Sequence, residues 1–286
     1  MKRICTGLAA VAALGLLSGC ASSGGAQKSS GSTGSAGGAY VIKSGDGVVG
    51  YYTFDEAIDD NEVVDHSGLG INVYTAALDG SVQVEGKVGD GLSFNGEDEY
   101  ITLEGDVLDG DGFTFAAWLK PNAWKDWTRV FDIGDTTEDM WCGMDFETKK
   151  LRFDVIGGKG SCSLLADLPA TGTWTHVAAT LGNGKAAIYV DGKLADEKPV
   201  AVTVANIAAN VQGIFVGRSN WPDPLFDGVM DEVLVANRAF SAKEIAAVKN
   251  GIVAPGSDGD AAEAEAAAEE SEESVTIDEE ASDEEI

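Results

Sequence analysis

Basic residues are scarce in this chain of 286 residues, which carries 19 lysine and arginine residues against 48 aspartate and glutamate residues. The formal net charge is −29 at pH 7, and no segment concentrates lysine and arginine. A surface that follows nucleic-acid phosphates needs such a concentration. Nucleic-acid binding is therefore excluded, and attraction to anionic lipid headgroups is disfavoured for the same reason.

Histidine is rarer still, with only His66 and His176 in the chain. Two isolated imidazoles do not form a histidine-rich metal cluster, and the sequence has neither a nucleophile elbow nor a glycine-rich phosphate loop. His176 lies in a strand pattern, where a core or sheet-face role is the default, and His66 lies in a turn. These absences argue against most enzyme classes.

The chain also lacks an apolar run long enough for a membrane-spanning helix, which takes about 20 residues. Its longest run spans residues 8–17, follows Lys2 and Arg3, and ends in LSGC at Cys20. This pattern predicts a cleavable export signal over residues 1–19. Its end resembles the bacterial lipobox signal, which implies a lipid on Cys20 and a lipid-anchored protein in the cell envelope, outside the cytoplasm. The alternative is an ordinary secretory signal that is cut nearby.

The segments on either side of the central region have too little apolar content to build a core. Residues 20–39 hold the expected anchor and a flexible tether of serine, glycine and alanine. Ala21, rather than an aspartate, follows Cys20, which indicates the outer membrane if the cell has two membranes. Residues 252–286 are expected to be a disordered acidic tail, with 14 acidic and no basic residues from Pro255 onward. The folded domain is expected over residues 40–251.

Cysteine is limited to four residues, which fall into two groups. Cys5 would leave with the leader, and Cys20 would carry the lipid. Cys142 and Cys162 remain as an even pair in an oxidising compartment, which predicts one disulfide. The alternative is two buried free thiols.

The central region alternates apolar and polar residues with a period of two, which is typical of strands. Glycine, aspartate and asparagine turns separate the strands, and Gly182-Asn183-Gly184 and Asp191-Gly192 are hairpin signals. One helix is expected after Ser241, with Glu244 completing a capping box. We expect an all-β, two-sheet antiparallel jelly-roll sandwich with one short C-terminal helix. The expected strands are residues 48–54, 91–94, 100–103, 114–120, 129–133, 151–156, 175–181, 185–190, 214–217 and 228–235.

Several ordered segments between residues 45 and 250 resemble one known family. They include GYYTFDE, VVDHSGLG, EGKVGDGLSFNGEDEYITL, FTFAAWLKP, WTHVAATLGNGKAAIYVDGKL and VGRSNWPDPLFDGVMDEVLVANRAFSAKEI. Together they are similar to the LamG-like, concanavalin A-type jelly roll of bacterial surface proteins and glycosidase accessory modules. The resemblance implies a sandwich of twelve to fourteen strands, and says less about ligand, because the fold hosts lectins, adhesion modules and enzymes.

The resemblance also implies a structural Ca²⁺ ion near the first strand, the Asp-x-Ser-Gly turn and the last strand. The matching positions are Asp55, Asp65 with the Gly68 carbonyl, and Asp231. Calcium takes six to eight oxygen ligands, which acidic turns supply, although ordinary acidic turns without a metal are an equal alternative. A rival calcium loop holds Asp106, Asp109 and Asp111, but it lacks the downstream glutamate of an EF-hand.

An enzyme of this fold would need two catalytic carboxylates. Laminarinase-type relatives carry them in a Glu-x-Asp-x-x-Glu pattern, which this sequence lacks. Asp145 and Glu147, two residues apart, are the one pair that would share a strand face, and a solvated strand edge is the competing reading. No enzyme activity and no catalytic residue are expected.

Aromatic side chains on loops are the best indication of a ligand surface, because sugar rings stack on them. Trp124, Asp126, Trp127 and Trp141 form the predicted site, with packing against the sheet as the alternative. Trp118 and Trp174 stand in strand patterns, and Trp221 is expected mainly to pack. The predicted function is a non-catalytic, surface-tethered module that recognises a carbohydrate polymer. The alternative is a structural or adhesion lipoprotein that binds another envelope or matrix protein.

Overall fold

The computed structural model describes residues 42–43, 46–58, 61–70, 73–76, 82–251 and 253–254. Cys20, the expected leader and tether, and nearly all of the expected acidic tail lie outside the described residues. In the described ranges, no helix has the length and apolar character needed to cross a membrane.

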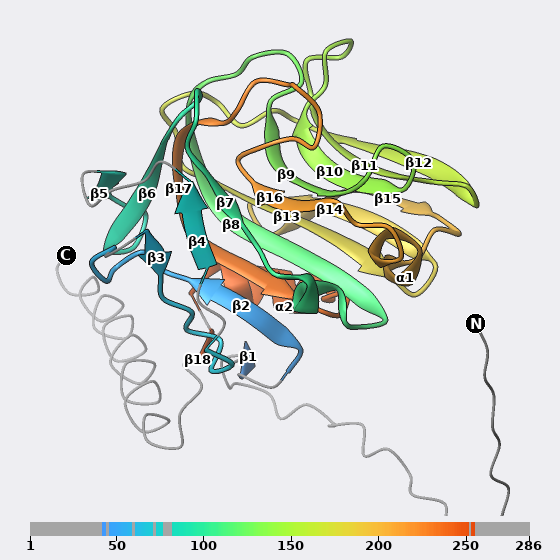
Figure 1. Cartoon of the computed structure of the whole chain (residues 1–286), viewed down its shortest axis with the longest axis horizontal. Helices are drawn as coiled ribbons and strands as arrows, with labels where there is room; N and C mark the ends of the chain where they lie inside the picture. Colours follow the sequence, from blue (N-terminus) through green and yellow to red (C-terminus); the bar gives the residue numbers. More distant parts are fainter. Residues whose placement is uncertain are drawn as a thin grey trace, which may run out of the picture. The chain divides into compact units, whose positions relative to one another are not determined.

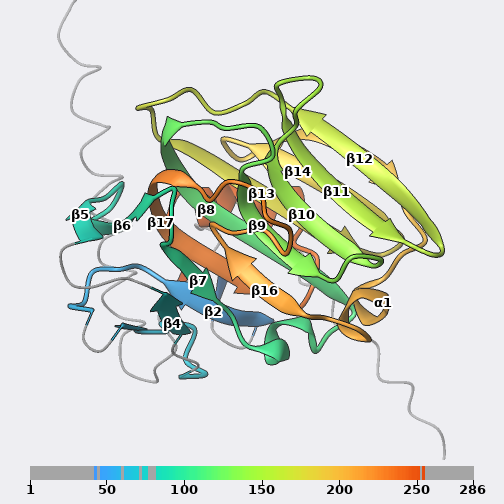
Figure 2. The ribbon, with the colours of Figure 1, turned by 45° about the horizontal axis from the view of Figure 1, so that its top comes forward.

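Two antiparallel sheets make up most of the described chain (Figures 1 and 2). The first sheet has eight strands in the order β12-β11-β10-β9-β16-β7-β4-β3. These strands are β3 (Glu62–Val63), β4 (Val73–Ala76), β7 (Tyr100–Thr102), β9 (Arg129–Gly134), β10 (Asp139–Met144), β11 (Leu151–Gly157), β12 (Gly160–Ala166) and β16 (Gly213–Val216).

The second sheet also has eight strands, in the order β15-β14-β13-β8-β17-β6-β5, with β2 paired to β17. The first and last strands of the sandwich therefore lie side by side, with Tyr52 opposite Val233. The strands are β2 (Val48–Tyr52), β5 (Gln83–Glu85), β6 (Asp90–Asn95), β8 (Gly112–Ala123), β13 (Thr175–Gly182), β14 (Lys185–Val190), β15 (Lys193–Pro199) and β17 (Asp227–Ala236).

The remaining elements are short. β1 (Ile42–Lys43) pairs in parallel with β18 (Val253–Ala254). The helices are a 3-10 turn at Gly105–Leu108, α1 (Val204–Ala208) and α2 (Ala242–Lys249). The expected all-β sandwich is confirmed. The described chain has 18 strands, more than the expected twelve to fourteen, because several additional strands are only two or three residues long.

The main core lies between the sheets, where the period of two places alternate apolar side chains. Phe115 of β8, Phe131 of β9 and Phe153 of β11 meet there, with ring centroids 4.7 Å and 6.0 Å apart. A second core lies on the other face of the second sheet. There Ile245 and Val248 of α2 are buried, as the sequence pattern predicts.

The ten expected strands are all present, and the two expected hairpin turns join β13 to β14 and β14 to β15. Asn183, Gly184, Asp191 and Gly192 all have positive φ, between 50° and 73°. Such two-residue turns match the right-handed twist of the flanking strands. The capping box at Ser241 is confirmed, since its side chain accepts a hydrogen bond from Glu244 N.

The expected disulfide between Cys142 and Cys162 is wrong: both are buried free thiols. Cys142 lies on β10 and Cys162 on β12, and β11 runs between these strands. Two strand spacings amount to about 9.5 Å, whereas a disulfide requires Cα atoms within about 7 Å. Both side chains belong to the core between the sheets, where cysteine behaves as a small apolar residue.

β12 and β15 are the neighbouring edge strands of the two sheets. The Asp196 carboxylate of β15 accepts a hydrogen bond from Leu165 N of β12 at 3.2 Å. The Lys198 ammonium group donates one to the carbonyl oxygen of Ser163 at 2.5 Å. Charged side chains of one edge thus satisfy backbone groups of the other.

Candidate functional site

A row of polar and aromatic side chains crosses the outer face of the first sheet. Strand register places Phe215 opposite Asp132, Asp132 opposite Trp141, Trp141 opposite Asp154, and Asp154 opposite Ser163. Residues opposite each other point to the same face, so these five side chains form one line over β16, β9, β10, β11 and β12. We call this line the cross-strand row; it spans about 19 Å.

Arg129 covers the middle of the cross-strand row. Its guanidinium lies 3.8 Å from the centre of the Trp141 ring, within the range of a cation–π contact. Nε lies 3.3 Å from Oδ2 of Asp132, and Nη2 lies 3.1 Å from Oδ2 of Asp223. Arg129 is 4% exposed, so its charge is balanced by carboxylates and not by bulk water.

The loop after β16 is fixed to the same carboxylate. Ser219 Oγ donates to Oδ2 of Asp132 at 3.0 Å, and the Asn220 amide donates to Oδ1 at 2.7 Å. These bonds hold Trp221 at the margin of the face with 47% of its surface exposed. The expected packing role of Trp221 therefore does not account for its position.

A second guanidinium, that of Arg152, lies 5.4 Å from the centre of the Trp141 ring. Its Nε donates to Asp154, its Nη1 to Asp145 at 2.9 Å, and its Nη2 to Ser163 at 3.0 Å. Burial raises the pKa of Asp145, but hydrogen bonds from Thr148 and Arg152 outweigh it and hold this pKa below its usual range.

Two aromatic rings extend the face toward solvent. Trp127, with φ of 70°, lies edge-on to Trp141 at 6.2 Å between ring centroids. Phe146, in the turn between β10 and β11, stacks on Trp127 at 6.2 Å and is 48% exposed. Asp126 and Lys149 form an ion pair beside them. We call Trp127, Phe146 and the neighbouring Trp141 the aromatic platform.

Asp139 is the least satisfied group of this face. It is 5% exposed, and no donor among the described residues reaches its Oδ1. Burial, and then the charge of Asp132, raise the pKa of Asp139 well above its ordinary value of 3.8. Both causes favour the protonated form of Asp139, which can then donate a hydrogen bond to Asp132.

The structure brings together three of the four predicted ligand residues, Asp126, Trp127 and Trp141. Trp124 lies elsewhere, because its Nε1 donates to the Pro169 carbonyl at 2.9 Å and its ring packs against Phe226. Arg129, Asp132, Arg152, Asp154 and Phe146 complete the face and were not predicted. A signal was present in RFDV, where Arg152 and Asp154 are two residues apart and so share one face of β11. Arg129 and Asp132 are three residues apart, and alternation does not predict that they meet; the pairing of β9 with β10 is irregular beside Arg129.

The residues of the predicted calcium site lie in two places. Asp55 and Asp231 approach the same loop, where Asp55 accepts from Asp90 N and Asp231 accepts from Lys87 N and Val88 N. Burial, and to a lesser degree Asp55, raises the pKa of Asp231 to about 6.

Asp65 instead caps the adjacent turn, accepting hydrogen bonds from Tyr51 N, Ser67 N and Ser67 Oγ. Gly68 is exposed in that turn, with φ of 85°. No group of three or more histidine, cysteine, aspartate or glutamate side chains in the described chain is arranged to hold a metal ion. The four residues thus do not form a ligand sphere as they stand, and calcium stays a prediction.

The other acidic candidates occupy turns. β10 ends at Met144, so Asp145 and Glu147 do not share a strand face; Asp145 caps the turn through Thr148 and Glu147 is exposed. The rival calcium residues Asp106, Asp109 and Asp111 are exposed in and after the 3-10 turn.

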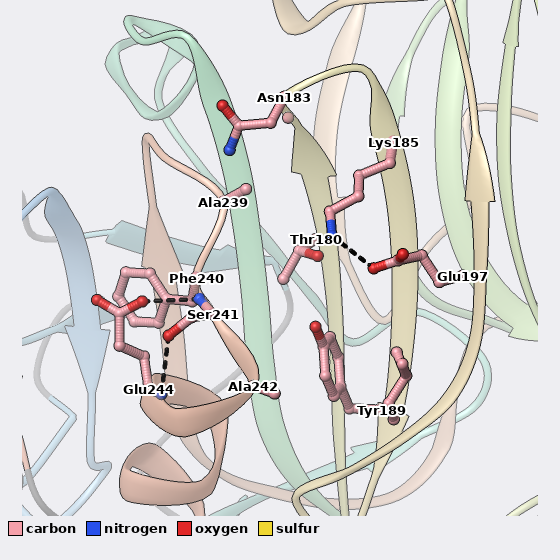
Figure 3. A pocket seen from close by; sticks show the side chains of 12 residues that line it. Thr180, Asn183, Lys185, Tyr189, Glu197, Ala239, Phe240, Ser241, Ala242 and Glu244 are labelled. Atoms are coloured by element: carbon pink, nitrogen blue, oxygen red, sulfur yellow. Dashed lines mark hydrogen bonds and ion pairs between the residues drawn. The ribbon is translucent and has the colours of Figure 1, made fainter.

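A pocket of about 330 Å³ lies on the second sheet, between β13, β14, β15 and the start of α2 (Figure 3). Its charged groups are already paired: Lys185 with Glu197 at 2.7 Å, and Glu244 with Ser241 N and Arg238. Tyr189 and Leu194 add apolar surface. The pocket has no exposed aromatic pair comparable to the aromatic platform, so we place the candidate site on the first sheet.

Comparison with solved structures shows the same fold in several proteins. Domain 4 of AbnA, a GH43 extracellular arabinanase from Geobacillus stearothermophilus solved with arabinotriose, is 22% identical (TM-score 0.52; 71% of this chain and 98% of that chain). Botulinum neurotoxin type C, whose cell entry depends on two ganglioside molecules, is 16% identical (TM-score 0.53; 74% and 52%). The binding domain of botulinum neurotoxin DC, solved with rat synaptotagmin II, is 16% identical (TM-score 0.54; 73% and 52%).

The match therefore spans nearly all of the arabinanase domain but only about half of each toxin chain. No protein of curated function matches the sequence. Residues 95–246, just over half of the chain, match the family described as the concanavalin A-like lectin/glucanases superfamily. With the two-sheet sandwich, this match establishes that the chain belongs to the concanavalin A-like lectin/glucanases superfamily.

Proposed function

We propose that this domain is a non-catalytic module that binds a carbohydrate polymer over the aromatic platform and the cross-strand row. The observation that carries the proposal is the stacked pair of Trp127 and Phe146 beside buried carboxylates and guanidinium groups. Sugar faces stack on aromatic rings, while sugar hydroxyls bond to carboxylates and amides. Two proteins of the same fold support this ligand class: the arabinanase domain was solved with arabinotriose, and cell entry of botulinum neurotoxin type C depends on gangliosides.

Two features support a binding role without catalysis. Both oxygens of Asp132 already accept hydrogen bonds, from Arg129 and Ser219 on one side and from Asn220 on the other. Asp132 is fully buried, so its carboxylate has neither the access nor the free lone pair of a nucleophile. A hydrolase would need both in one of its two carboxylates.

The proposal includes an anchor and an ion that belong to the sequence prediction. A lipid on Cys20 would hold the domain in the cell envelope, where a module without catalytic groups serves to locate or retain a polymer. A structural calcium ion would stabilise the loop between β5 and β6, which Asp55 and Asp231 both contact and near which their like charges lie close together.

Alanine substitutions test the binding role. A glycan array first identifies the ligand, and Trp127→Ala and Phe146→Ala are then each expected to weaken binding by roughly tenfold or more, measured by titration calorimetry. Leu194→Ala is the matched control, because Leu194 is also exposed, at 51%, but lies on the second sheet. Unchanged affinity in both platform variants, with unchanged melting, would contradict the proposal.

The second candidate is an adhesion protein that binds another envelope or matrix protein. It is favoured by the exposed rings of Phe146 and Trp221 and by the complex of one structural neighbour with synaptotagmin. A blank glycan array, combined with cross-linking of one defined envelope protein to the Trp221 loop, would decide for this candidate.

A further inference from the structure

The cations of the aromatic platform and its surroundings are already neutralised. Each is held by a carboxylate of the same face within 3.3 Å: Arg129 by Asp132 and Asp223, Arg152 by Asp145 and Asp154, and Lys149 by Asp126. An anionic ligand that sought one of these cations would have to displace its carboxylate, which would then be left without a partner. For the buried Asp132, Asp145 and Asp154, the loss of the partner cation is costly.

The groups of this face that can still form hydrogen bonds with a ligand are carboxylate oxygens, which accept hydrogen bonds. Asp223 and Asp126 lie at the margin, with 22% and 44% of their side chains exposed. Hydroxyl groups of a sugar donate hydrogen bonds to such oxygens, whereas carboxylate and sulfate groups only accept them.

One cation stands apart from this pattern. The Arg218 guanidinium lies 4.5 Å from the ring centres of both Tyr100 and Phe215, at the β7 end of the face. Among the ion pairs of the described residues, none involves Arg218. An acidic sugar could therefore bind only the Arg218 guanidinium without displacing a carboxylate. The carboxylates along the rest of the row would repel it.

We propose that this face selects uncharged polysaccharides and discriminates against polysaccharides that carry carboxylate or sulfate groups. The inference rests on the proposed function and specifies its ligand class. The net negative charge of the whole chain acts in the same direction, because it repels an approaching anionic polymer. Like charges brought together in the complex would also weaken its binding.

The test is calorimetry of the full chain with neutral arabinan and glucan oligosaccharides, oligogalacturonate, sialyllactose and heparin oligosaccharides. We expect at least one neutral ligand to bind with an affinity that is independent of salt, and the acidic ligands to bind at least about tenfold more weakly. An acidic ligand that binds as tightly as the best neutral one, with affinity that Arg218→Gln abolishes, would overturn the inference and leave the proposed function standing. Binding of none of these ligands would overturn both.

A matched pair of variants tests the charge argument itself. Lys149 and Lys185 are both 53% exposed, and each pairs with one carboxylate, Asp126 on the candidate face and Glu197 on the second sheet. Asp126→Asn frees Lys149 and is expected to strengthen binding of the acidic ligands severalfold, most at low salt. Glu197→Gln frees Lys185 and is expected to leave the binding of the acidic ligands unchanged. Equal effects of the two variants would show that only the net charge of the chain matters, against selection by this face.

Discussion

Asp139 of β10 and Asp132 of β9 are carboxylates on neighbouring strands, and the charge of Asp132, which is paired with Arg129, raises the pKa of Asp139. Asp132 is fully buried and Asp139 is 5% exposed. Two adjacent buried carboxylates cannot both remain charged, and Arg129 compensates only one of them. The raised pKa of Asp139 follows from this, because a proton on Asp139 removes the repulsion between the two groups.

This arrangement makes stability depend on pH in a defined direction. The folded pKa of Asp139 lies above its ordinary value of 3.8, so the stability that the proton confers is complete below that value and is lost as pH rises toward the folded pKa. Asp139→Asn keeps a donor for Asp132 and needs no proton. We expect the variant to be more stable than wild type by about 2 kcal/mol near pH 8 and equally stable near pH 4, measured by denaturant unfolding. A uniform loss of stability at every pH would contradict this.

His176 predicts the opposite pH dependence. It is 1% exposed beside Trp118, both ring nitrogens lack partners in the described chain, and burial lowers its pKa to about 3. Neutral His176 therefore contributes stability above its unfolded pKa of 6.5, and this stability is lost as pH falls toward 3. His176→Phe should gain about 2 kcal/mol relative to wild type on going from about pH 7 to about pH 5. Comparison with wild type at each pH isolates this effect from Asp231 and Glu232, and a constant difference would refute it.

The two core cysteines should react as thiols. When the chain is unfolded without reductant, a thiol reagent is expected to detect two reactive thiol groups, those of Cys142 and Cys162, because both are free in the folded protein. Dithiothreitol should leave the melting temperature unchanged, because no bond between them would be reduced. Cys5 and Cys20 are replaced by serine for this measurement. A lower melting temperature in reductant would restore the disulfide prediction.

Calcium can be tested by its removal. A structural ion at Asp55 and Asp231 predicts that EGTA lowers the melting temperature and that added calcium restores it. Asp55→Asn should reduce this shift, and Asp106→Asn should not affect it, because Asp106 lies in the rival loop. A midpoint that EGTA does not move contradicts a structural calcium ion.

The sequence predicted the fold well because the two sheets follow local rules. Alternation of apolar residues located β8, β13, β14 and β17, and turn residues such as Asn183 and Gly184 fixed the hairpins between them. β12 and β15 were not predicted. β15 is a charged strand without an apolar face, so its place depends on pairing with β14 and on contacts with β12.

The candidate site was predicted only in part, because strand register decides which distant residues meet. Trp127 and Trp141 were grouped as aromatic side chains near loops, but Phe215 and Asp154 join the same face only through pairing across five strands. Trp124 looked equivalent to Trp127 in sequence. A backbone carbonyl of Pro169 and the ring of Phe226 direct Trp124 inward, and neither contact is visible in its local sequence.

The contacts between β12 and β15 also affect whether neighbouring copies of the chain can aggregate through their strand edges. An open strand edge is a template for another chain and so a starting point for aggregation. Asp196 and Lys198 occupy backbone groups of β12 that an incoming strand would need, and Pro199 ends β15 with a residue that has no N–H to offer. Neighbouring copies of the chain would therefore meet side chains at this edge, which opposes strand pairing between them there.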